Sequence, residues 1–169
     1  MILTMSDNQI KKIYLRDVMT KKVISVSPET PITEVTKIIT EHNFDGVPVV
    51  DKNNRLVGII TEYDLITQTS TINASFLQKI ITDIYAEKKE DPPKIGTQDI
   101  SELKVQDIMN REPLTLGENA TFEEAIETFK AHHRVNPIPI VNDRNEVLGI
   151  ISRFDILRPL NILSYSKKK

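Results

Sequence analysis

The chain carries two copies of one segment, and this duplication limits its possible folds more than any other feature. One stretch begins at Leu15 and reads LRDVMTKKVISVSPETPITEVTKII; it matches VQDIMNREPLTLGENATFEEAIETF, which begins 90 residues later at Val105. Another begins at Gly46 and reads GVPVVDKNNRLVGIITEYDLI; it matches PIPIVNDRNEVLGIISRFDIL, which begins 91 residues later at Pro137. Two copies of roughly 50 residues predict two equivalent structural units.

Each copy predicts the same order of helices and strands. A short helix holds the Asp-Val-Met or Asp-Ile-Met triplet, and a strand, a longer helix, two strands and a final helix follow. In the first copy the expected segments are a strand at 23–26, a helix at 31–42, strands at 47–50 and 56–61, and a helix near Asp64. In the second they are a strand at 114–116, a helix at 121–132, strands at 138–141 and 147–152, and a helix near Asp155.

Local signals support the longer helices. Apolar residues recur at helical spacing in the first of them, at Ile32, Val35, Ile38 and Ile39. Pro31 suits the first helical turn, and Thr121 followed by Glu124 predicts a capping box at the start of the second.

The chain divides into a first repeat at 12–66, a connecting segment at 67–101 and a second repeat at 102–158. Apolar residues in the connection predict an amphipathic helix at 74–90 that ends at Asp91-Pro92-Pro93 and packs on the repeat core rather than on a partner chain. One repeat is too small to bury its own apolar face. We therefore expect an α/β (α+β) fold in which two βαββα units pack with pseudo-two-fold symmetry.

Composition argues against several classes of function. The chain has 22 basic and 24 acidic residues, a balance that disfavours a nucleic-acid footprint or a polybasic membrane surface. It has no Cys, and its three His show no metal-ligand spacing, so we expect no disulfide, no metal site and no cofactor. No apolar run approaches the roughly 20 residues of a membrane span, and the first residues show no signal-peptide core. These features predict a cytoplasmic protein.

The most informative spacing is Thr61-x-x-Asp64, repeated as Ser152-x-x-Asp155. In each copy an apolar strand leads into a hydroxyl residue, and an Asp follows three residues later at the start of a helix. The N–H groups of such a helix start favour an anion, and a carboxylate can accept hydrogen bonds from a vicinal diol such as a ribose. Ordinary helix capping by the same four side chains is the alternative, and the spacing alone leaves both open.

The repeated motifs resemble the CBS (cystathionine β-synthase) domain, which occurs in tandem pairs called Bateman modules. The matching features are DVM, VPVVD, LVGIIT and the DL pair, at about 12–66 and 102–157. The resemblance implies a regulatory module that binds an adenosine-containing ligand such as AMP, ATP or S-adenosylmethionine between its repeats. It implies that Asp64 and Asp155 bind ribose hydroxyls, with Thr61 and Ser152 near the phosphate. We expect the pair to stand alone and to form a homodimer that acts on an unidentified regulated protein.

The resemblance also implies that each adenine lies against the other repeat, although plain core packing would explain the same apolar residues. For the Thr61/Asp64 site the implied contacts are Pro113, Leu114, Asn136 and Ile138. For the Ser152/Asp155 site they are Val23, Ile24, Asp45 and Val47.

Two departures from the family pattern concern phosphate binding. Family members often have an Arg just before the Asp, where this chain has Tyr63 and Phe154, and the positions before the VPVV-type strands lack a cation. Arg153 in the second copy corresponds to Glu62 in the first. This exchange predicts that the Ser152/Asp155 site binds a phosphorylated ligand more tightly.

A structural interaction module with empty clefts is the alternative function. An enzyme is disfavoured, because the sequence has no Cys nucleophile and no P-loop, GxGxxG or HExxH string, and no catalytic residue is predicted.

Overall fold

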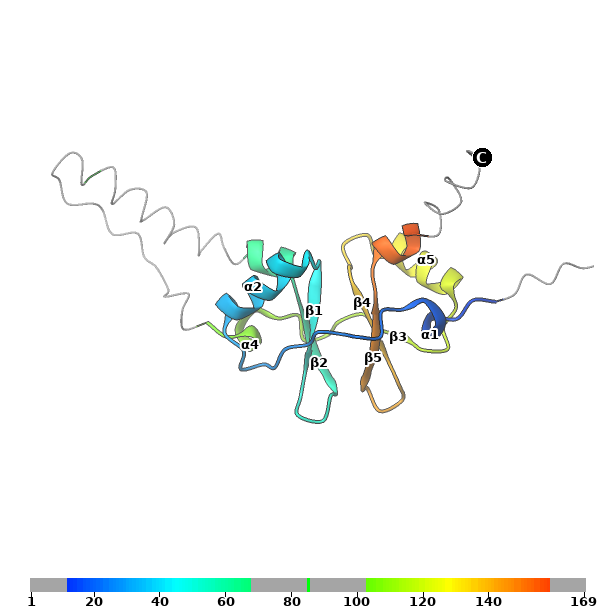
Figure 1. Ribbon diagram of the computed structural model, residues 1–169, viewed down its shortest axis with the longest axis horizontal. Coiled ribbons are helices and arrows are strands. Elements are labelled where there is room, and N and C mark those ends of the chain that lie inside the picture. The colour runs from blue at the N-terminus through cyan, green and yellow to red at the C-terminus, as the bar shows by residue number, and fades with distance from the viewer. Residues whose placement is uncertain (1–11, 68–84, 86–102, 159–169) are drawn as a thin grey trace, which may run out of the picture.

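The computed structural model describes residues 12–67, 85 and 103–158. Figure 1 shows two sheet-and-helix units side by side, one for each repeat. The helix predicted at 74–90 lies outside the described residues, apart from Tyr85. Within the described residues, no helix combines the length and hydropathy needed to cross a membrane.

The first unit has α2 (Ile32–His42) against a hairpin of β1 (Gly46–Val50) and β2 (Leu56–Thr61). The second has α5 (Phe122–Ala131) against β3 (Leu116–Gly117), β4 (Ile138–Val141) and β5 (Val147–Ile151). β4 pairs with β5 antiparallel and with β3 parallel. Residues 62–67 and 153–158 are helical and follow β2 and β5. These elements confirm the mixed α/β repeat fold.

The first strand of each repeat is shorter than predicted. In the first repeat it is a single parallel bridge between Val26 and Val49, and in the second it is only Leu116–Gly117. Pro48 is the third residue of β1, and Pro139 is the second residue of β4. Proline has no N–H to donate to a neighbouring strand. The parallel ladder therefore cannot extend backwards from residue 26 or residue 116.

The predicted helix starts are largely correct. Glu124 donates its N–H to Thr121 Oγ1 at 3.2 Å, and Thr121 donates its N–H to Glu124 Oε2 at 2.6 Å, which confirms the capping box. Pro31 is the residue before α2 rather than part of its first turn.

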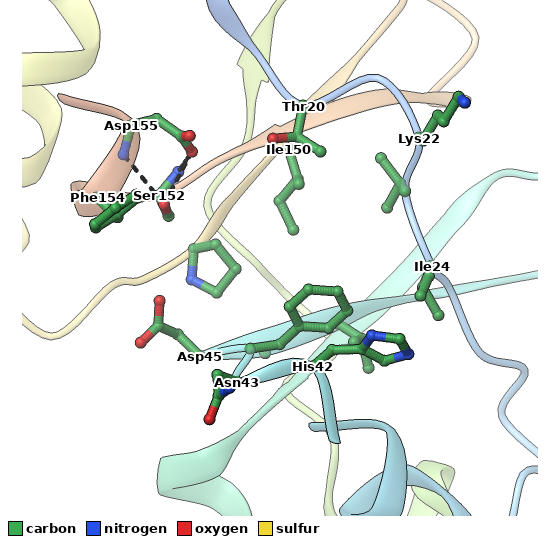
Figure 2. Close-up of a pocket in the computed structure, with 15 residues that line it drawn as sticks. Thr20, Lys22, Ile24, His42, Asn43, Asp45, Ile150, Ser152, Phe154 and Asp155 are labelled. Atoms are coloured by element: carbon green, nitrogen blue, oxygen red, sulfur yellow. Dashed lines mark hydrogen bonds between the residues drawn. The ribbon is translucent and has the colours of Figure 1, made fainter. Parts of the chain in front are cut away.

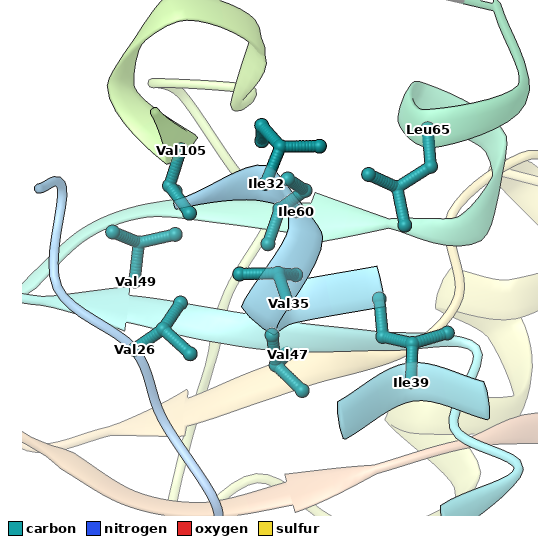
Figure 3. Close-up of a cluster of buried hydrophobic side chains, with 9 residues drawn as sticks. All are labelled: Val26, Ile32, Val35, Ile39, Val47, Val49, Ile60, Leu65 and Val105. Atoms are coloured by element: carbon teal, nitrogen blue, oxygen red, sulfur yellow. The ribbon is translucent and has the colours of Figure 1, made fainter. Parts of the chain in front are cut away.

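Each core is completed by a helix from the other sequence repeat. α1 (Leu15–Val18) lies beside the second unit and α4 (Val105–Ile108) beside the first (Figure 1). Leu15 is fully buried among Ala125, Ile138 and other core residues of the second repeat. Val105 is fully buried in the core of the first repeat, where Figure 3 shows it beside Val49 and Ile32. The two units therefore depend on each other for their cores.

The exchanged segments cross the strands at two glycines. Thr20 pairs with Ile150 beside Gly149, and Asn110 pairs with Ile59 beside Gly58. A Cβ added at Gly58 would lie 2.8 Å from the Asn110 carbonyl oxygen and 2.8 Å from Met109 Sδ. A Cβ added at Gly149 would clash with the Met19 side chain. The methionine of each triplet thus packs on the strand glycine of the other repeat.

The hairpin tips also meet across the pseudo-two-fold axis. Leu56 donates its N–H to the Asn145 carbonyl at 2.8 Å, and Val147 donates its N–H to the Asn54 carbonyl at 3.1 Å. The side-chain amides of Asn145 and Asn54 return bonds to the carbonyls of Leu56 and Val147, at 2.8 and 3.0 Å. Both asparagines adopt the left-handed conformation, with φ of 60° and 61°, which asparagine tolerates better than most residues.

Candidate functional site

Asp64 and Asp155 each cap a helix start with one carboxylate oxygen. Asp155 Oδ2 accepts the Ser152 N–H at 2.8 Å and the Ser152 hydroxyl at 2.9 Å. Asp64 Oδ2 accepts the Thr61 N–H at 2.9 Å and the Thr61 hydroxyl at 2.6 Å. No described residue donates to the other oxygen, Oδ1, of either carboxylate. The capping alternative is therefore real, and it leaves half of each carboxylate free to bind a second group.

The Ser152/Asp155 segment borders a pocket of about 270 Å³ (Figure 2). All four residues assigned to this site from the other repeat line it: Val23, Ile24, Asp45 and Val47. Sequence reasoning missed several further lining residues, among them Thr20, Lys22, His42, Phe44, Ile150 and Phe154. The helix that ends at His42 and the pairing of Thr20 with Ile150 bring these residues to the pocket. The helix has a local sequence signal, whereas the pairing of Thr20 with Ile150 has none.

The Thr61/Asp64 segment borders a second pocket of about 240 Å³. Pro113, Leu114 and Asn136 line it, as assigned, together with Tyr63 and Arg134. Ile138 does not line it, because its side chain is fully buried in the core of the second repeat with Ile140. Alternate residues of a strand face opposite sides, which places Ile138 on the helix side of β4.

A third pocket of about 400 Å³ adjoins the Thr61/Asp64 pocket. Its lining consists of Asp45, Thr61, Glu62, Tyr63, Arg134, Asn136 and Arg153. Arg153 was assigned to the Ser152/Asp155 site, but it is not among the residues that line that pocket.

The direction of Arg153 follows from its contacts. Its backbone N–H donates to Asn136 Oδ1 at 3.0 Å, and its guanidinium donates to the carbonyls of His133 and of Val135. The guanidinium carbon also lies 5.9 Å from the centre of the Phe129 ring. These contacts turn the side chain back onto the loop before β4, away from Ser152.

Among the described residues, no group of three His, Asp or Glu side chains is placed to hold a metal ion. Some of the exposed apolar side chains lie beside the pockets. Tyr63 is 61% exposed and Phe154 is 67% exposed, and Ile24 at the edge of the Ser152/Asp155 pocket is 38% exposed. The arrangement offers an apolar slot, an exposed aromatic ring and a free carboxylate oxygen at each site.

Known proteins resemble this chain in sequence or in fold. The chain is 34% identical to inosine-5'-monophosphate dehydrogenase of Methanocaldococcus jannaschii over 84% of its length, and it spans only 22% of that enzyme. A crystal structure of CBSX2 in complex with AMP superposes with a TM-score of 0.65 at 24% identity, covering 90% of this chain and 98% of that one. The CBS domain pair of protein MJ0100 in complex with 5'-methylthioadenosine and S-adenosyl-L-methionine gives 0.65 at 23% identity, covering 89% and 97%.

The two repeats themselves carry the family assignment. The model of the CBS domain matches the chain twice, at residues 15–69 and 105–161, which together make up more than half of its length. The matches coincide with the two units that share cores, glycine contacts and hairpin tips across the pseudo-two-fold axis. The chain therefore belongs to the CBS-domain family and contains a tandem pair of CBS domains.

Proposed function

We propose that this chain is a regulatory module that binds adenosine-containing ligands in its two equivalent pockets, with Asp64 and Asp155 accepting ribose hydroxyls. The observation that carries the proposal is the divided use of each carboxylate. Oδ2 is occupied by the helix cap, while Oδ1 accepts nothing from the described residues. A carboxylate oxygen held in place by its neighbour is ready to accept from a diol without first losing an internal hydrogen bond.

The apolar walls suit a purine ring. The apolar lining of the Ser152/Asp155 pocket that comes from the first repeat includes Val23 and Ile24, together with Val47, which is 1% exposed and packs in the first core. The volume of about 270 Å³ is near the lower end of small-molecule sites, which span roughly 300–1,000 Å³, and favours a nucleoside-sized ligand over a dinucleotide. The AMP, 5'-methylthioadenosine and S-adenosyl-L-methionine complexes of proteins with this fold support the same ligand class.

Thermal unfolding and calorimetry with adenosine, AMP, ATP and S-adenosylmethionine test the proposal. A ligand present at 100 times its Kd should stabilise the fold by about 2.7 kcal/mol. Absence of both a thermal shift and a binding heat for all four compounds would instead favour an interaction module with empty pockets.

The proposal assigns regulation rather than catalysis to the chain. Among the described residues, no group of three His, Asp or Glu side chains is placed to hold a metal ion that would activate water. We expect no steady release of ADP from ATP above a buffer control. Release that Asp155→Ala abolishes would contradict this part of the proposal.

We also propose a homodimer in the cytoplasm, which acts on a protein partner not yet identified. Tyr63 and Ile66 on the helix after β2, and Phe154 and Leu157 on the helix after β5, leave equivalent apolar pairs exposed. Exposed apolar side chains at matching positions are typical of surfaces that associate. Light scattering should give about 39 kDa, twice the chain mass of 19.3 kDa. A mass of one chain at micromolar concentration would contradict the dimer.

A further inference from the structure

The wall of the Ser152/Asp155 pocket contains a pair of stacked rings. The rings of His42 and Phe44 lie with their centres 5.0 Å apart and their planes 18° from parallel. Both residues line the pocket, and Figure 2 shows His42 at its edge. The first repeat thus supplies a flat aromatic surface to the pocket that contains the carboxylate of the second repeat.

The end of α2 brings the two rings together. Asn43 follows the helix in the left-handed conformation, with φ of 52°, and Phe44 donates its N–H to the Ile39 carbonyl at 3.0 Å. This hydrogen bond is a common feature of helix ends that reverse the chain direction through one left-handed residue. Phe44 also packs against the core of the first repeat, whereas His42 is exposed. The core therefore holds the Phe44 ring in place before any ligand binds.

The second repeat has no equivalent pair among its described residues. The counterpart of Phe44 is Val135, 91 positions later, which has no ring. The counterpart of His42 is His132, which caps α5 with φ of −122° instead of a left-handed conformation and is not among the residues that line the other pocket. The two pockets therefore differ in the aromatic surface that they offer to a ligand.

Aromatic rings are effective contacts for a nucleobase. A base stacks on an aromatic side chain with little dependence on its hydrogen-bonding groups, because every base has a π face. The gain increases with the ring area that is covered, so a purine with two rings gains more than a pyrimidine with one. A ring that is already held by the core loses little conformational entropy on binding. The stacked pair therefore favours a purine in this pocket.

We infer that His42 and Phe44 form the base-stacking surface of the Ser152/Asp155 pocket and make it the tighter and the more purine-selective of the two nucleoside sites. This inference rests on the proposed function and adds a ranking of the two pockets to it. Neither residue was assigned to the site from the sequence. The ranking depends on the base and not on a group attached to the ribose, so nucleosides without phosphate are sufficient to test it.

Calorimetry with adenosine and cytidine on the full chain tests the inference. Cytidine has the same ribose and also carries an exocyclic amine, but its base has one ring instead of two. Asp64→Asn weakens the other pocket, and Asp155→Asn weakens the pocket with the stacked rings. Adenosine should bind more tightly to the Asp64→Asn chain than to the Asp155→Asn chain, and the ratio of adenosine to cytidine affinity should also be larger in the Asp64→Asn chain.

Substitutions of the two rings, made in the Asp64→Asn chain, identify the residues responsible. Phe44→Leu keeps an apolar side chain on the core and removes the ring, and it should weaken adenosine binding about tenfold and lower the ratio of adenosine to cytidine affinity. His42→Gln changes an exposed side chain and should weaken adenosine binding about threefold. His132→Gln changes the exposed counterpart in the second repeat; it is the matched control and should leave both affinities unchanged.

Proton NMR provides a readout that a merely structural role of the rings would not change. The chain has only three histidines, so the ring C–H signals of His42, His132 and His133 can be followed one by one. In the Asp64→Asn chain, adenosine should shift the signals of His42 through the ring current of the base. The signals of His132 and His133 should stay in place, because neither residue lines the pocket with the stacked rings.

Four results would overturn the inference. Unchanged adenosine affinity in both Phe44→Leu and His42→Gln would refute the stacking surface and leave the proposed function standing. Equal weakening of adenosine and cytidine binding by Phe44→Leu would limit Phe44 to core packing and refute it as well. Adenosine binding to the Asp64→Asn chain without a shift of the His42 signals would have the same meaning. Failure of the unmodified chain to bind adenosine would refute the proposed function and the stacking surface together.

Discussion

In both repeats, side chains accept hydrogen bonds from backbone N–H groups at equivalent positions. The charge of these side chains differs between the repeats at some positions and is the same at others. At the hairpin tips, Asp51 Oδ1 accepts the N–H groups of residues 53 and 55, and Asn142 Oδ1 accepts those of residues 144 and 146. At the pockets, both repeats have an Asp. Asparagine could supply an acceptor at either place, as Asn142 does. The two turns therefore differ in this residue, and Asn142 also donates from its amide nitrogen to Glu146 Oε2 at 2.6 Å. Both pockets, in contrast, keep the carboxylate and its second oxygen.

The same comparison applies to position 62 and its counterpart 153. Glu62 and Arg153 occupy equivalent places, yet both line the third pocket, together with Thr61. The pseudo-symmetry of the backbone therefore does not extend to the electrostatics. These two equivalent residues line the same pocket, so the charged groups near the two sites differ although each site has a matching Asp.

The largest expected effect tests whether the units depend on each other for their cores. Leu15→Ala removes a fully buried side chain from the core of the second repeat and should cost about 2–5 kcal/mol of unfolding free energy, measured with urea. Amide exchange should accelerate most at Ala125 and Phe129, far from residue 15 in sequence. Val18→Ala, on the same helix but 37% exposed, is the control and should change stability by less than about 0.5 kcal/mol. Faster exchange confined to residues 32–60 would contradict the exchanged arrangement.

The strand glycines provide the next test, since their surroundings differ between the repeats. Gly58→Ala pushes a methyl group against the backbone oxygen of Asn110 and should cost about 1–3 kcal/mol. In Gly149→Ala the three atoms nearest to the added carbon all belong to the flexible Met19 side chain, so the change should cost less than about 1 kcal/mol. Gly117→Ala has no atom within 4 Å of the added carbon and is the control. Equal losses for Gly58→Ala and Gly149→Ala in thermal unfolding would show that the crossings are equivalent.

The ribose contacts should respond to a change that preserves the cap. In Asp155→Asn the amide oxygen can still accept from Ser152, while the amide nitrogen replaces the free oxygen and cannot accept from a diol. Affinity for adenosine should fall at least about tenfold, with a stability loss under about 1 kcal/mol. Asp64→Asn should have the same effect at the other site only. Unchanged affinity in both variants, measured by calorimetry, would limit these carboxylates to capping.

The smallest effect concerns the hairpin tips and pH. The hydrogen bond from the N–H of Arg55 is the largest cause that lowers the pKa of Asp51 below its ordinary value of 3.8. Loss of solvation opposes it, and the hydrogen bond from the N–H of Asn53 lowers the pKa further. A carboxyl with a lowered folded pKa contributes stability that is present above pH 3.8 and is lost as the pH falls through the folded value. Asp51→Asn should therefore reduce the drop in urea midpoint below pH 3.8. Parallel pH curves for the unmodified chain and this variant would exclude the contribution.

Much of the fold follows from local sequence because its determinants lie within a few residues of one another. The stripe at Ile32, Val35 and Ile39, the Thr121–Glu124 capping box and the paired hydroxyl–Asp segments are interactions over one helical turn. The duplication adds the expectation of two equivalent units, and the family resemblance adds the expectation that residues of the other repeat line each site. Proline at positions 48 and 139 could have predicted the shortened strands, since the missing donors are visible in the sequence.

The remaining features depend on residues about 90 positions apart, and no local preference determines them. The exchange of α1 and α4 places Leu15 and Val105 in each other's repeats, and the Met–Gly crossings follow from it. The direction of the Arg153 side chain also depends on tertiary contacts. A long side chain at a helix start can turn toward either neighbouring pocket, and here the carbonyls of the loop before β4 select the direction. Sequence determined which groups each repeat offers, and tertiary packing decided which pocket each of them serves.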